Sequence, residues 1–257
     1  ARQYCGMLGK QDNCQVAVSV TLACQGGSLP VAWQLYLPKE WADDPVRREK
    51  AGVPKDVQFA TKGQIALAQI QHLMAQGAPR HCFLADAGYG VDTALREGLS
   101  EMGLPYVVGV TGSLTVWPPG HAPLAPEAYS GRGVVPTRLR LGKARHERPL
   151  SVKDVAFELE PAQWHSIEWR EGTNFTLRSR FARVRVRAAH REHLRTEQRP
   201  EEWLLIEWPE GHKEPMKYWL STLPEDMPLQ RMILEAKMRW RIERDYQDLK
   251  QDLGLGH

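Results

Sequence analysis

The sequence contains little cysteine, and none of it in a metal-binding or redox spacing. Its 257 residues include four cysteines, and no two of them are separated by only two residues. The C-x-x-C spacing of zinc domains and of dithiol redox sites is therefore absent. We expect free, buried thiols, as is usual in a reducing compartment, at Cys5, Cys14, Cys24 and Cys82.

Long apolar runs are also missing. No run reaches the roughly 20 residues that a membrane-spanning helix needs, and the first residues do not follow the charged-then-apolar order of a secretory signal. The composition, 42% apolar and 25% charged, is that of a globular protein with one large core or one core with a sizeable insertion. These features predict a cytoplasmic protein without a membrane partner.

Positive charge is concentrated in one part of the chain. Between Arg132 and Arg199 there are 16 Lys and Arg against 8 Asp and Glu, a surplus of 8. The whole chain carries a net charge of only +3, so the remainder carries −5. A basic block in a mildly acidic protein favours a polyanionic partner, most simply nucleic acid, and a solvated basic surface is the alternative.

The first 112 residues follow an α/β pattern. Two β-branched runs flank the Gly26-Gly27 pair, which predicts a hairpin, and alternating helices and strands follow it. The predicted segments are strands at Cys14–Cys24 and Val31–Leu37, a helix from Thr61 to Gly77, a strand at His81–Ala85, a helix at Val91–Gly103 and a strand at Tyr106–Val110.

Residues 113–200 differ from the preceding residues in composition and pattern, and they predict a β-rich, basic insertion. Pro and Gly crowd Trp117–Pro136, and short alternating runs follow at Val152–Phe157, Ile167–Arg170 and Phe181–Arg187. Arg183, Arg185 and Arg187 alternate with valines, so their guanidinium groups leave one strand on the same face. Three guanidinium groups on one face are better suited to binding a nucleic-acid phosphate backbone than to packing in a hydrophobic core. Residues 201–257 then return to the core with strands at Trp203–Trp208 and Lys217–Leu220 and a closing helix.

The closing helix is predicted as one long amphipathic element over Pro228–Gly254. Its apolar stripe is Leu234, Met238, Ile242, Tyr246, Leu249 and Leu253. Arg239, Glu243 and Lys250 follow at offsets of four and seven, which places them along one side. A carboxylate between two cations can serve a metal or phosphate site, and it is equally the pattern of an ordinary helical salt-bridge ladder.

A second carboxylate stands at a strand end. Asp86 follows the apolar strand directly and precedes Gly88 and Gly90, the place where open α/β sheets position their sites. A turn or capping aspartate is the alternative. Asp86 and Glu243 are far apart in sequence, and two-metal phosphoryl chemistry uses acids of this kind when the fold brings them together.

Three segments together resemble the DDE transposases of bacterial insertion sequences, in the branch of the DDE superfamily endonucleases. They are R-Q-Y-C-G-x-L-G-K-x-x-N-C-Q at Arg2–Gln15, L-A-D-A-G-Y-G around Asp86, and R-x-x-x-E-x-x-x-x-x-x-K at Arg239, Glu243 and Lys250. The resemblance covers essentially the whole chain. It implies an RNase H-like α/β fold, in which helices flank a mixed sheet and a β-rich insertion precedes the last helix.

The resemblance also implies roles for individual residues. Asp86 is similar to the second acid of the catalytic triad and Glu243 to the third, which would share Mg²⁺ or Mn²⁺. Arg239 and Lys250 are similar to the basic members of the Y-R-E-K signature, which hold DNA phosphates. The tyrosine of that signature falls on Ala236, so its stacking function is absent here or supplied elsewhere.

The first acid of the triad has no match. The family carries it on the first strand, and the predicted hairpin resembles the second and third strands. The resemblance thus implies that this acid precedes Ala1 and that the chain is an amino-terminally incomplete transposase. Asp12 is the nearest carboxylate, but it is expected in a loop ahead of the wrong strand.

The expected function is therefore metal-dependent cleavage and strand transfer of DNA, with transposon ends and target DNA as partners and a homo-oligomer assembled on DNA. A catalytically inactive DNA-binding relic is the main alternative. A resolvase or nuclease of the same fold is a third hypothesis, but it gives no reason for the opening block or for the Arg-Glu-Lys helix pattern.

Overall fold

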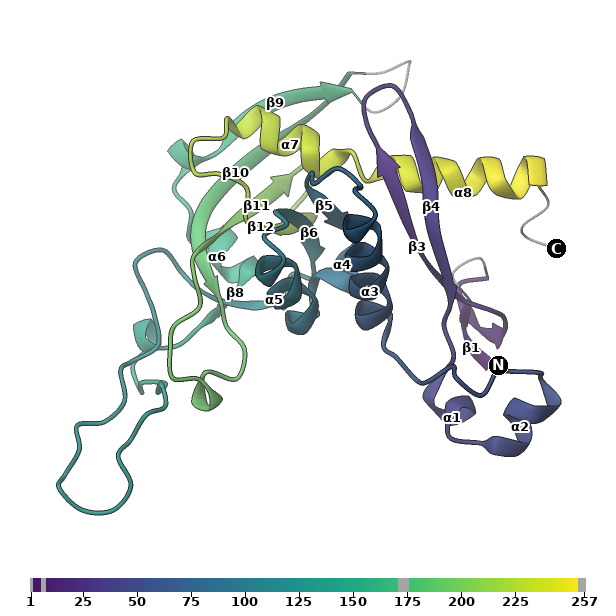
Figure 1. Cartoon of the computed structure of the whole chain (residues 1–257). Helices are drawn as coiled ribbons and strands as arrows, with labels where there is room; N and C mark the ends of the chain where they lie inside the picture. Colours follow the sequence, from purple (N-terminus) through teal and green to yellow (C-terminus); the bar gives the residue numbers. More distant parts are fainter. Residues whose placement is uncertain (1, 6–7, 171–175, 254–257) are drawn as a thin grey trace. The chain divides into compact units, whose positions relative to one another are not determined.

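The computed structural model describes residues 2–5, 8–170 and 176–253, which divide into two compact units (Figure 1). One unit consists of Ala1–Arg80 together with Trp240–His257, and the other of His81–Arg239. The functional divisions near 112 and 200 that the sequence suggests stay predictions.

The described residues of the first unit form two hairpins and four helices. The strands are β1 (Arg2–Cys5), β2 (Lys10–Asn13), β3 (Ala17–Ala23) and β4 (Ser28–Leu35), and the helices are α1 (Lys39–Ala42), α2 (Pro45–Lys50), α3 (Lys62–Ala75) and α8 (Trp240–Leu253). The β3–β4 pairing confirms the predicted hairpin. The β1–β2 hairpin was not predicted, and Asp12 lies on β2 rather than in a loop, because the chain reverses direction within the opening block.

Capping chemistry fixes the start of α3 where the sequence placed it. The Thr61 hydroxyl accepts a hydrogen bond from the Gln64 backbone N–H at 3.2 Å, and the Gln64 side-chain oxygen accepts one from the Thr61 N–H at 2.8 Å. This reciprocal pair satisfies two N–H groups at the helix start that lack intrahelical partners. The Gln69 amide then donates to the Val18 carbonyl at 3.2 Å and ties α3 to β3.

Polar contacts hold α8 against the β3–β4 hairpin. The Tyr246 hydroxyl lies 2.7 Å from the Ser19 hydroxyl, and the Tyr246 ring meets the Trp33 ring edge-on with 5.4 Å between centroids. Ser28 donates to the Asp245 carboxylate. The interface between α8 and the hairpin therefore contains polar side chains as well as the predicted apolar ones.

The second unit is built on one eight-stranded sheet, with α4, α5, α6 and α7 on the same unit. The strand order is β5-β6-β12-β11-β10-β7-β8, and β9 pairs with β10 off this path. β5 and β6 are parallel, whereas the other described pairings of this sheet are antiparallel, so the predicted mixed α/β sheet is confirmed and is consistent with an RNase H-like fold. The strands are β5 (Phe83–Ala85), β6 (Tyr106–Val110), β7 (Thr115–Trp117), β8 (Leu150–Ser151), β9 (His165–Arg170), β10 (Thr176–Ala188), β11 (Glu202–Trp208) and β12 (Lys217–Ser221).

The helices of this unit are α4 (Ala87–Gly90), α5 (Thr93–Glu101), α6 (Val152–Glu158) and α7 (Leu229–Lys237). α6 corrects a prediction, because the run Val152–Phe157 is helical and not an alternating strand. The Ser151 hydroxyl accepts from the Asp154 N–H at 3.0 Å and caps the helix, which buries Val152, Val155 and Ala156. The strands of the predicted insertion, β7 to β10, lie in the same sheet as β5 and β6.

The closing helix is not continuous, which is the second correction. α7 ends at Lys237, Met238 and Arg239 form a turn, and α8 begins at Trp240. α7 buries Met232, Ile233, Ala236 and Lys237, whereas the α8 stripe is centred on Ile242, Tyr246 and Leu249. At 3.6 residues per turn these two stripes are about two-fifths of a turn out of phase, so one straight helix cannot bury both on one face. Gly254, the predicted end of the helix, lies outside the described residues.

A buried ion pair fixes α7 on the sheet. The Lys237 ammonium lies 3.0 and 2.8 Å from the two carboxylate oxygens of Glu207 on β11, and the side chains are 6% and 5% exposed. The Lys237 nitrogen also lies 4.3 Å from the centroid of the Trp169 ring and within 6 Å of those of Phe181 and Trp219. Charge pairing and cation–π contacts together compensate for removing this cation from water.

The cysteine prediction is only partly correct. All four thiols are free, but Cys5, Cys14 and Cys82 are only half-buried, and Cys24 is exposed in the β3–β4 turn, where its N–H donates to the Gly27 carbonyl at 2.8 Å. Burial, with a smaller contribution from the Glu235 carboxylate, raises the pKa of Cys82 to about 12. Among the described helices, none combines the length and the apolar character needed to cross a membrane.

The ion pair predicts a specific pattern of stability. Lys237→Met leaves the Glu207 carboxylate buried without its partner, so we expect a loss of about 3–5 kcal/mol in the free energy of unfolding. The double variant Lys237→Met/Glu207→Leu removes both charges and should recover most of this loss. Urea unfolding measures both, and a double variant no more stable than Lys237→Met would contradict the assignment.

The thiols predict an order of alkylation. At pH 8 iodoacetamide should modify Cys24 first, because it is exposed, and Cys82 last, because its raised pKa leaves very little thiolate. Mass spectrometry of the folded protein follows the order, and a denatured sample, in which all four should react alike, is the control. Equal rates for Cys82 and Cys24 in the folded protein would refute this.

Candidate active site

Asp86 lies where the sequence placed it, at the carboxyl end of strand β5, although Phe83 and Leu84 on that strand are only half-buried. Ala85 ends β5 and is buried, whereas Asp86 is exposed and is the N-cap residue of the one-turn helix α4. One of its carboxylate oxygens accepts a hydrogen bond from the Gly88 N–H at 2.9 Å. The capping alternative is thus realised, and it orients the carboxylate while leaving the side chain open to solvent.

Two glycines allow the Asp86 turn to sit directly on the neighbouring strand. A Cβ added to Gly90 would lie 1.9 Å from the Gly109 carbonyl oxygen on β6, and one added to Gly109 would lie 3.1 Å from the Ala87 nitrogen. Neither glycine has a positive φ, so the requirement is close approach of two backbones. A glycine inside the strand Y-V-V-G-V was a sequence signal for such an approach that our reading did not use.

A buried polar network supports the same corner. Arg96 on α5 donates to the Gly90 carbonyl at the end of α4, and Tyr106 on β6 donates to the Glu202 carboxylate at 2.7 Å. Burial raises the pKa of Glu202, while the Arg96 charge and the Tyr106 hydrogen bond act in the opposite direction. The pKa of Tyr106 is raised by burial and by Glu202. The network links α4 and α5 to β6 and β11.

The three residues singled out in the closing segment do not all belong to the same unit. Glu243 and Lys250 lie on α8 and are exposed, whereas Arg239 lies in the turn that ends the other unit. The three residues therefore do not lie on one continuous helix, because α8 begins after Arg239. Asp86 belongs to the His81–Arg239 unit and Glu243 to the other, so their approach to one another stays a prediction.

The three arginines of β10 do share one face, and each has partners within its own unit. Arg183 and Arg185 lie 4.5 and 4.9 Å from the centroid of the Trp203 ring. Arg187 pairs with Glu201 at 3.2 Å, and Arg185 donates to the Glu201 carbonyl at 2.8 Å. Our sequence reading missed these partners, because they come from a different segment of the chain.

The carboxylates named above have the chemistry that a hard divalent ion requires. Both Asp86 and Glu243 are exposed and offer oxygen ligands, so the donor type fits Mg²⁺ or Mn²⁺. Within the part of the chain that the structure describes, no three His, Cys, Asp or Glu side chains gather as a metal site. The described residues therefore do not by themselves gather three ligands for a metal ion.

Comparisons with known proteins agree with the resemblance seen in the sequence. The family model described as DDE superfamily endonuclease matches residues 1–176. A curated protein from Microchaete diplosiphon, a probable transposase for insertion sequence element IS701, is 34% identical over 110 residues. The matched stretch covers 42% of this chain and 26% of that relative, so it spans about a quarter of the relative's length.

The glycine contact predicts how the Asp86 turn responds to a methyl group. Gly90→Ala forces the Gly109 backbone away, so we expect a loss of about 1–3 kcal/mol in stability and displacement of α4. Gly27→Ala is the matched control, since a Cβ there meets nothing within 4 Å and should change stability little. Chemical denaturation compares the two, and equal effects would show that the contact does not constrain the turn.

Proposed function

Because the chain belongs to the DDE superfamily endonuclease family, we propose that it acts as a DNA transposase. The reaction is metal-dependent phosphoryl transfer, in which the ends of an insertion sequence are cleaved and then joined to target DNA. The observation that carries the proposal is the placement of Asp86, an exposed carboxylate oriented by a backbone N–H directly after the buried Ala85 at the carboxyl end of β5.

Asp86 and Glu243 are the proposed metal ligands. Their carboxylates supply two of the oxygen ligands that a divalent cation prefers, and the Gly88 N–H keeps the Asp86 carboxylate in one orientation. A bound divalent cation supplies activation of the attacking oxygen and stabilisation of the leaving oxygen. Because both side chains are exposed, DNA has access to each of them.

Arg239, Lys250 and the arginines of β10 are the proposed phosphate-binding residues. Arg183, Arg185 and Arg187 are held in place by Trp203 and Glu201. A guanidinium group has five donor hydrogens, so these internal contacts leave donors for a phosphate. The partly buried arginines would then contact the backbone in a fixed orientation, which favours positioning rather than base readout.

The proposed partners are transposon ends and target DNA, with assembly of a homo-oligomer on DNA in the cytoplasm. The basic surplus between Arg132 and Arg199 supports a polyanionic partner. Since this charge lies on the unit that carries Asp86, DNA attracted to it is brought to the same unit as the proposed ligand.

The proposal is tested by isosteric substitution of the two acids. Glu243→Gln and Asp86→Asn should each abolish Mg²⁺-dependent strand cleavage of terminal-repeat DNA, because an amide replaces a metal-binding carboxylate. DNA binding should change less than about twofold, and in Asp86→Asn the amide oxygen can still accept from the Gly88 N–H. Asp252→Asn, which alters an exposed carboxylate on the same helix as Glu243, is the matched control and should cleave normally.

Retained cleavage in Glu243→Gln would overturn the assignment of Glu243. Loss of cleavage in all three variants would trace the effect to helix charge rather than to metal ligation. The assay is carried out with the full-length protein.

A further inference from the structure

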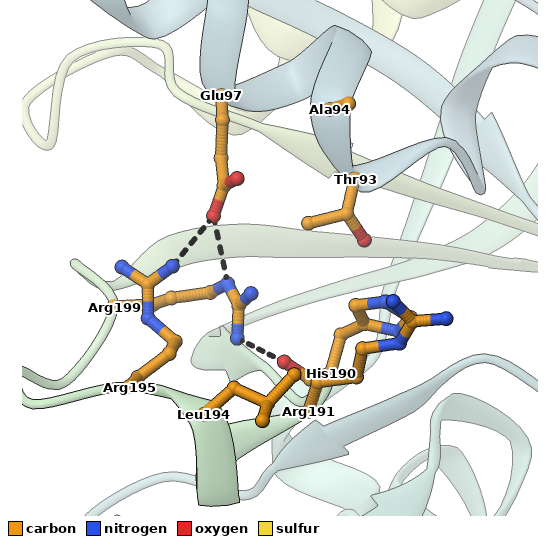
Figure 2. A pocket seen from close by; sticks show the side chains of 8 residues that line it. All are labelled: Thr93, Ala94, Glu97, His190, Arg191, Leu194, Arg195 and Arg199. Atoms are coloured by element: carbon orange, nitrogen blue, oxygen red, sulfur yellow. Dashed lines mark hydrogen bonds and ion pairs between the residues drawn. The ribbon is translucent and has the colours of Figure 1, made fainter. Parts of the chain in front are cut away.

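A charged cavity lies beside the first turns of α5. Its volume is about 330 Å³, and all its lining residues belong to the His81–Arg239 unit. α5 contributes Thr93, Ala94 and Glu97. The segment that follows β10 contributes the rest, as Figure 2 shows: His190, Arg191, Leu194, Arg195 and Arg199.

The carboxylates near this cavity engage two of its three arginines. Glu97 pairs with Arg195 at 2.8 Å and with Arg199 at 3.3 Å, and Figure 2 shows it between the two. Arg199 also pairs with the buried Glu192 at 3.0 Å. With three guanidinium groups against two carboxylates, one positive charge is left without a counter-charge.

Arg191 carries that remaining charge. Its side chain is exposed and has no hydrogen bond or ion pair to any residue in the described part of the chain. Its backbone is left-handed, with φ of 52°, the single non-glycine case among the described residues. An L-residue in this conformation is strained. The turn nevertheless presents an arginine to the cavity, directly before the short helix Glu192–Leu194 that precedes Arg195.

The electrostatic surroundings favour an anion at this place. Burial lowers the pKa of Arg199, and the Arg195 charge lowers it further. The pKa of His190 is also lowered, first by burial and then by the charges of Arg191 and Arg199. Burial is the largest cause of both shifts, and the charges of neighbouring arginines act in the same direction. Ala94 and Leu194 are the apolar residues of the lining, too few for the mainly apolar wall that small organic ligands need.

We infer that this cavity binds one phosphate of the DNA backbone, with Arg191 as its principal contact. A phosphodiester carries a single negative charge, which matches the one uncompensated guanidinium, whereas inorganic phosphate and nucleotides carry more. The cavity wall begins at α5, two residues after the α4 turn that Asp86 caps, so the same DNA can reach both. The inference rests on the proposed function, because it takes DNA as the polyanion.

Arg191→Gly provides the test. Glycine adopts positive φ readily, so the melting temperature should stay unchanged or rise, and a binding defect cannot come from unfolding. We expect affinity for duplex DNA to fall about tenfold, and the slope of log Kd against log salt to fall by about 0.9, which corresponds to one phosphate contact. Fluorescence anisotropy over a salt series measures both.

Arg132→Gly is the matched control. It removes one charge from an exposed arginine that lies between two glycines of positive φ, outside the cavity. It should lower affinity by less than about twofold. Equal losses in the two variants would overturn the inference, because net charge would then explain both, and so would an unchanged affinity and salt slope in Arg191→Gly.

Free inorganic phosphate offers the same chemistry as a DNA phosphate, and a second experiment distinguishes the two ligands. At ionic strength matched with chloride, it should not stabilise the chain specifically. Specific stabilisation that Arg191→Gly abolishes, with DNA binding unchanged, would assign the cavity to free phosphate and overturn the DNA assignment. If the unsubstituted protein does not bind duplex DNA, the proposed function fails as well, whereas equal binding by both proteins refutes the cavity alone.

Discussion

The ion pair between Lys237 and Glu207 determines where α7 ends on the sheet. An ammonium group in the interior is tolerated only with a close counter-charge and further polar or π contacts. Glu207 supplies the charge from β11, and Trp169, Phe181 and Trp219 supply ring contacts from β9, β10 and β12. Four adjacent strands must therefore be in register before Lys237 can be buried. This constraint sets the rotation of α7 about its own axis. It also makes Lys237 the last buried residue of α7 before the turn to α8.

A different constraint governs the corner at Asp86. There the backbone of α4 lies so close to β6 that only glycine fits at Gly90, and a Cβ at Gly109 would be crowded 3.1 Å from the Ala87 nitrogen. Arg96 donates to the last carbonyl of the turn, and the Gly88 N–H donates to the Asp86 carboxylate, so both ends of the turn are held by hydrogen bonds. A side chain held in this way loses little conformational entropy when it binds a cation, which is the value of a preorganised ligand.

Fewer positive charges are available to bind a polyanion in this fold than the sequence suggests. The basic block has a surplus of eight, yet the arginines of β10 contact Glu201, Trp203 and backbone carbonyls, and Arg195 and Arg199 contact Glu97. The positive groups that remain for a polyanion are fewer and are fixed in position. Arg191 differs from the others because its turn carries it away from these carboxylates.

The sequence by itself determined the local elements and the place of Asp86. Alternation of β-branched residues around a Gly-Gly pair defined the β3–β4 hairpin, and the Thr61–Gln64 capping pair defined the start of α3, because such signals act over a few residues. The helix at Val152–Phe157 also has a local signal, the Ser151 cap, which our sequence analysis did not use. Tertiary structure decided the burial of Lys237 before the break at Met238 and Arg239, and the partners of the arginines. These depend on contacts between segments far apart in the chain, and hydrophobic periodicity carries no information about which distant carboxylate or ring will lie opposite a given side chain.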